Sequence, residues 1–141
     1  NQVKIWHRSF DVKPPLLDVN DERNPANQAM YRNVDAKALP LAESLETTID
    51  RVIPYYEANI KKDMEAGKRV LIAAHGNSIR ALVKYFENMD KDTIVGVNIP
   101  TGVPLVYEFD EDFHVQKKYY LVDPDAIQAK MKAVANQGKA K

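Results

Sequence analysis

The chain has 141 residues, 45% of them hydrophobic, so it is long enough for one domain with a core and too short for two. Its 20 basic and 20 acidic residues cancel to a formal charge of zero, which leaves no net field to attract nucleic acid or an anionic membrane. The absence of cysteine excludes disulfides, thiolate metal sites and cysteine nucleophiles. Since its apolar runs are far shorter than the ~20 residues that cross a bilayer, we expect a soluble, cytoplasmic protein.

The first 40 residues predict a short helix followed by a long loop. Val3, Trp6 and Phe10 fall on one face of an amphipathic helix that is already under way at the first residue, and there is no initiator Met. We therefore expect the natural start to lie upstream. Residues 11–40 lose the helical period and are interrupted by four prolines, which predicts a long irregular loop that is either functional or disordered.

A long helix is predicted next. Ser44 is suited to cap its start, Gly67 can end it, and Pro54 should bend it. Its core-facing side is indicated by apolar residues at helical spacing: Leu45, Ile49, Val52, Ile53, Tyr56, Ile60 and Met64.

The centre of the chain predicts half of an α/β crossover unit. Residues 70–74 form an apolar run without alternation, which is typical of a strand buried on both faces of a parallel sheet. Residues 75–78 form a tight turn, and a second amphipathic helix follows, with its apolar face at Ile79, Leu82, Val83 and Phe86.

The last third predicts a hairpin or edge strands, and then a helix. The acidic turn 110–112 is flanked by residues 104–109 and 113–121. His114, in the second of these two segments, should be exposed. Residues 123–135 predict the final helix, capped by one of its two first aspartates, and residues 136–141 predict a mobile tail.

His75 is the main candidate for chemistry. It directly follows the predicted strand, and ligands of open α/β sheets bind beyond the carboxyl ends of the strands. Gly76 allows close backbone approach, and Asn77 and Ser78 lie where free helix N–H groups attract an anion. Near neutral pH the imidazole can transfer a proton or stabilise negative charge. The alternative is a capping turn in which His75 only hydrogen-bonds the loop.

Further candidates are weaker. His7 and Arg8 can present positive charge beside Trp6, and Arg suits a phosphate or carboxylate, although the pair taken alone is better explained as a solvated helix face. Glu43 can orient His75 or an arginine, or serve as a first-turn carboxylate. The three histidines lack metal-ligand spacing, so we expect no metal site, and no P-loop, dinucleotide or serine-hydrolase motif is present.

The chain closely resembles the cofactor-dependent phosphoglycerate mutases of the histidine phosphatase superfamily along essentially its whole length. The resemblance is carried by LPLAESLETTIDRVIPYY, AAHGNSIRALVKYF, NIPTGVPLVYEFD and VANQGKAK. It implies an α/β three-layer sandwich with a mostly parallel sheet flanked by helices. It also implies interconversion of 2- and 3-phosphoglycerate in glycolysis through a phosphohistidine, priming by 2,3-bisphosphoglycerate without a metal, and a homo-oligomer, either dimer or tetramer.

The resemblance also assigns roles to residues. His75 corresponds to the second active-site histidine, Gly76 and Asn77 to the ligand-contacting turn, and His7 and Arg8 to a substrate-binding pair in which His7 replaces an arginine. The family's Arg-His-Gly motif with the nucleophilic histidine and its Glu-Arg-His-Tyr segment are absent. Residues 1–141 are therefore expected to be the C-terminal portion of one domain, inactive in isolation.

Two alternatives stay open at this point. One is a bisphosphoglycerate mutase or phosphatase of the same superfamily. The other is a catalytically inactive, truncated module for anion binding or oligomerisation.

Overall fold

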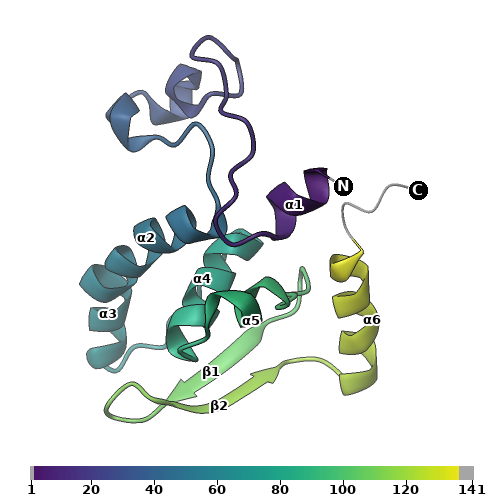
Figure 1. Cartoon of the computed structure of the whole chain (residues 1–141). Coiled ribbons are helices and arrows are strands. Elements are labelled where there is room, and N and C mark those ends of the chain that lie inside the picture. Colours follow the sequence, from purple (N-terminus) through teal and green to yellow (C-terminus); the bar gives the residue numbers. More distant parts are fainter. Residues whose placement is uncertain (1, 137–141) are drawn as a thin grey trace.

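The computed structural model describes residues 2–136, in which α2 and α5 lie beside a central helix, α4, and α6 stands apart from it (Figure 1). In these residues α2 packs against α4, and the two strands pair with each other. The helices and strands are α1 (Gln2–Arg8), α2 (Leu45–Tyr55), α3 (Lys61–Glu65), α4 (Gly76–Phe86), α5 (Lys91–Val95), β1 (Leu105–Phe109), β2 (Val115–Tyr120) and α6 (Pro124–Ala135).

The core joins α2, α4, α5 and β1. Its fully buried centre consists of Leu45 from α2, Val83 from α4 and Ile94 from α5. Burial of side chains of this size stabilises a fold by roughly 1.5–3 kcal/mol each. The half-buried residues that surround this centre are Phe10, Ile49, Ile79, Met89, Val97, Ile99, Leu105 and Tyr107.

The predicted long helix is confirmed, including its cap and its bend. Ser44 accepts a hydrogen bond from the Thr47 N–H, and the Thr47 side chain accepts one from the Ser44 N–H, so the two form a capping box. Pro54 has no N–H to donate within the helix. A π-helical turn follows directly at Tyr56–Ile60, and the helix changes direction between α2 and α3 (Figure 1). Gly67, at φ +78°, ends it.

The predicted buried strand at 70–74 is wrong for this structure. These residues form no strand, and they are largely exposed: Leu71 is 91% and Val70 40% exposed. A strand requires a neighbour that pairs with its N–H and C=O groups, and no described strand lies beside this segment. The crossover unit and the parallel sheet are therefore absent from residues 2–136.

The predicted hairpin is confirmed. β1 pairs antiparallel with β2, from Leu105 opposite Tyr120 to an irregularity after Glu108. The rings of Tyr107 and Phe109 lie 5.4 and 5.0 Å from that of Phe86, so the hairpin packs against the end of α4. His114, between the strands, is exposed as expected.

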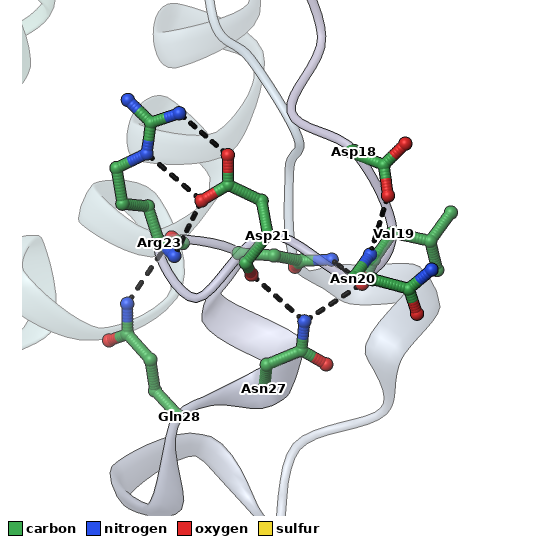
Figure 2. Close-up of polar contacts among 8 residues, drawn as sticks. Asp18, Val19, Asn20, Asp21, Arg23, Asn27 and Gln28 are labelled. Atoms are coloured by element: carbon green, nitrogen blue, oxygen red, sulfur yellow. Dashed lines mark hydrogen bonds and ion pairs between the residues drawn. The ribbon is translucent and has the colours of Figure 1, made fainter.

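Residues 11–40 form a loop that extends away from the other elements (Figure 1). It contains three short 3-10 turns, at Pro25–Asn27, Ala29–Tyr31 and Ala36–Ala38. Its tip is held by polar contacts, shown in Figure 2: Arg23 donates to both Asp21 carboxylate oxygens at 2.9 and 2.6 Å, and the Asn27 amide donates to the backbone at 2.8 and 2.9 Å. The loop therefore has local order although it is irregular.

The C-terminal helix is confirmed, with Asp123 as its cap. From residue 137 onward, the predicted mobile tail lies outside the described residues. None of the helices within residues 2–136 has the length and apolar character needed to cross a membrane.

The contact between Asp21 and Arg23 predicts a pH effect. Hydrogen bonds from Arg23 lower the pKa of the Asp21 carboxyl from 3.8 to about 2. The contact therefore stabilises the loop tip above the ordinary pKa of 3.8 and is lost as the pH falls through about 2. In Arg23→Gln, the Asp21 pKa should return toward 3.8, which NMR titration of the carboxyl carbon would detect.

The matched control is Arg32→Gln, which removes an exposed arginine of the same loop. It should leave the Asp21 titration unchanged. Equal shifts in both variants would contradict the assignment.

Candidate functional site

His75 occupies the N-cap position of α4. Its backbone is extended (φ −61°, ψ 148°), and its Nδ1 accepts the Asn77 N–H at 3.2 Å. This geometry requires an unprotonated Nδ1 and corresponds to the tautomer with the proton on Nε2. The side chain is exposed, so Nε2 can donate to a ligand. The capping role weighed from the sequence is present, and it leaves the imidazole available.

The first turn of α4 is open to an anion. The first N–H groups of a helix have no acceptor inside it, and the helix dipole adds partial positive charge there. A Cβ built on Gly76 would meet no atom within 4 Å, so nothing crowds the backbone at this point. The turn that begins at His75 can thus approach a phosphoryl group closely.

Asn77 is held by Arg80, a residue that the sequence analysis did not single out. Arg80 Nη1 donates to Asn77 Oδ1 at 3.2 Å, and Nη2 donates to the carbonyls of Ile94 at 2.7 Å and Val95 at 3.4 Å. Arg80 is buried, and this burial, together with the charge of Arg8, lowers its pKa. The available signal was a charged residue three positions after Asn77, beside the apolar residues Ile79, Ala81 and Leu82.

Arg8 approaches the same region from α1. Its Nη1 donates to Asn98 Oδ1 at 2.6 Å and its Nη2 to the Val134 carbonyl of α6. Asn98 in turn donates to the Gly96 carbonyl at 3.1 Å. Arg8 and Arg80 therefore both bind the short segment 94–98, which links α1 to the first turn of α4.

The other candidates do not join this arrangement. His7 is exposed, and its side chain makes no hydrogen bond within residues 2–136. Glu43 forms a two-bond ion pair with Arg51 at 2.8 and 2.9 Å and does not contact His75. That pairing raises the pKa of Arg51. Of the positions weighed from the sequence, the structure connects His75, Gly76, Asn77 and Arg8 and leaves out His7.

A groove of about 300 Å³ lies between α2, α4 and the segment before His75. Its walls are mostly apolar, so it suits an apolar chain segment better than a phosphate. Its lining residues are Arg51, Val52, Tyr55, Ile60, Ile72, Ala74, Ser78 and Leu82. Over the described part of the chain, no cluster of three or more His, Cys, Asp or Glu side chains could hold a metal ion.

Comparison with known proteins places this chain in a family. Over all 141 residues the chain is 59% identical to a protein of Treponema denticola named 2,3-bisphosphoglycerate-dependent phosphoglycerate mutase, and it spans 57% of that protein's length. Residues 16–120 match the family described as histidine phosphatase superfamily, branch 1, and this range includes His75, Gly76 and Asn77. Since the matched range covers most of the chain, the chain belongs to the histidine phosphatase superfamily.

Proposed function

We propose that this chain is the C-terminal part of a 2,3-bisphosphoglycerate-dependent phosphoglycerate mutase, which interconverts 2- and 3-phosphoglycerate. The observation that carries the proposal is the 59% identity to the Treponema denticola protein along the whole chain. The open first turn of α4, with an exposed imidazole at its cap, supports it.

The residues of this chain act in the proposed reaction as an electrostatic clamp. His75 donates from Nε2 to an oxygen of the phosphoryl group, and the N–H groups of the α4 first turn and the Asn77 amide donate to its other oxygens. In phosphoryl transfer the negative charge is spread over these oxygens, so donors fixed in advance stabilise the transition state. The histidine that accepts the phosphoryl group belongs, in this proposal, to an upstream segment.

The chain offers donors that fit 2,3-bisphosphoglycerate, the cofactor that we propose. Such an anion carries two phosphoryl groups, and the described residues present an exposed imidazole, an uncrowded helix N-terminus and the Arg8 guanidinium. When bound, the cofactor supplies the phosphoryl group that primes the enzyme. We further propose a homo-oligomeric, cytoplasmic enzyme.

The same proposal includes the fold of the longer protein. Residues 70–74 are apolar, unpaired and exposed, and they border an apolar groove. Upstream strands that pair with this segment would satisfy its backbone and turn it into a central strand of a mostly parallel sheet. α2 and α4 would then belong to the helical layers of a three-layer sandwich.

Hydrogen exchange tests this arrangement. The amides of residues 70–74 should exchange rapidly in the 141-residue chain, because no described strand pairs with them, and slowly in the longer protein. The amides of β1 are the internal control and should be protected in both. Rapid exchange at 70–74 in the longer protein would rule out the proposed sheet.

Replacement of His75 separates its catalytic role from its capping role. Asn is a good N-cap residue, so His75→Asn in the longer protein should keep α4 intact while removing the imidazole. We expect kcat for 3-phosphoglycerate to fall about 100- to 1,000-fold, the usual cost of losing one oriented donor. Circular dichroism should show an unchanged melting temperature.

The matched control is His114→Asn, which removes an exposed histidine from the hairpin and should leave kcat unchanged. If His75→Asn kept wild-type turnover, His75 would be a capping residue and nothing more.

The isolated 141-residue chain should show no mutase turnover in a coupled assay, because it has no Arg-His-Gly segment. Turnover that survived repurification would contradict this expectation.

The second candidate, a catalytically inactive module for anion binding or oligomerisation, is favoured by one observation: the chain spans 57% of the relative's length. Calorimetry of the isolated chain with 3-phosphoglycerate tests it. If the folded chain bound none, the anion-binding version would be excluded and an oligomerisation role would remain.

A further inference from the structure

Arg80 is a buried cation without a buried anion. Its side chain is 6% exposed, and within residues 2–136 no carboxylate bonds it. Its Nε has no hydrogen-bond partner there. Burying an unpaired charge costs free energy, which the remaining hydrogen bonds of Arg80 must offset in part.

The contacts of Arg80 connect two parts of the candidate site. One side of the guanidinium donates to Asn77 Oδ1 in the first turn of α4, at 3.2 Å. The other side donates to the carbonyls of Ile94 and Val95, at the end of α5. Asn98, which accepts a hydrogen bond from Arg8, follows three residues after Val95. The planar guanidinium can make both sets of bonds at once, whereas a lysine ammonium offers a single point of donation.

The bond to Asn77 also orients its amide. Oδ1 is occupied by Arg80, and Nδ2 donates to no other residue in the described part of the chain. An asparagine amide whose oxygen is bound inward has its two N–H donors directed away from that contact. Asn77 therefore has donors, rather than an acceptor, available to an anion at the start of α4.

We infer that Arg80 is a positioning residue: by holding Asn77 Oδ1 and the end of α5, it keeps the Asn77 Nδ2 donors aimed at the phosphoryl group. The inference rests on the proposed function for the identity of that anion. The orientation of the amide can be tested separately from mutase activity.

A double-mutant cycle in the longer protein tests the energetic link. Asn77→Ala and Arg80→Met should each lower kcat/KM for 3-phosphoglycerate about tenfold, the value of one hydrogen bond to a charged group. If Arg80 acts through Asn77, the double variant should also lose about tenfold. A loss of about a hundredfold would mean independent effects and would overturn the inference.

The controls separate positioning from general destabilisation. Lys84→Met removes another cation of α4 that donates to a backbone carbonyl, that of Met89 at 2.6 Å, and should leave kcat/KM unchanged. Arg80→Lys is a second variant for the case in which Arg80→Met does not fold, because lysine retains a donor for the end of α5. It should lower kcat/KM nonetheless, since it cannot reach Asn77 at the same time.

NMR of the 141-residue chain gives a readout that is independent of turnover. The NMR signals of the Asn77 side-chain amide are assigned by their loss in Asn77→Ala. They should show a mobile amide in Arg80→Lys and a rigid amide in Lys84→Met. Signals that remain rigid in Arg80→Lys would overturn the inference. If the longer wild-type protein has no mutase activity, the proposed function fails, and this measurement still decides the role of Arg80.

Discussion

Burial of one face of α4 is the constraint on which the other elements depend. Val83 packs with Leu45 of α2 and Ile94 of α5, and the rings of β1 cover Phe86 at the end of the helix. These contacts fix the direction of the helix axis. The N-terminal turn of α4 and the exposed imidazole at its cap are therefore held by packing that lies up to three turns away, so the proposed anion site needs no rigid loop of its own.

Polar contacts add to the apolar core in fixing the positions of α1, α4 and α5. Arg80 ties the first turn of α4 to the end of α5, and Arg8 ties α1 to Asn98 and α6. Burial of Arg80 and, after it, the positive charge of Arg8 lower the pKa of Arg80. Within residues 2–136 neither arginine forms an ion pair with a carboxylate, and such unpaired positive charge destabilises the unliganded protein and favours the binding of an anion. In this region stability and the proposed function oppose each other.

The segment before His75 is the place where sequence and structure disagree. Its apolar residues predict burial on both faces, and in the structure they are exposed because no described strand pairs with them. The apolar groove beside this segment also predicts burial, because α2 and α4 present apolar side chains there as well. Both observations agree with a chain that spans 57% of its relative.

By itself, the sequence determined the features that depend on near neighbours along the chain. The Ser44 cap, an aspartate cap on the last helix, the bend after Pro54, the β1–β2 hairpin and the helix that begins after His75 were all predictable, because caps, turns and amphipathic periods are set by residues a few positions apart. The sequence did not decide which of the two aspartates, Asp123 or Asp125, caps the last helix. Tertiary structure decided whether residues 70–74 form a strand, and it brought Arg80 to the end of α5 and Arg8 to Asn98 and α6. Those outcomes require partners from distant parts of the chain, which local patterns do not specify.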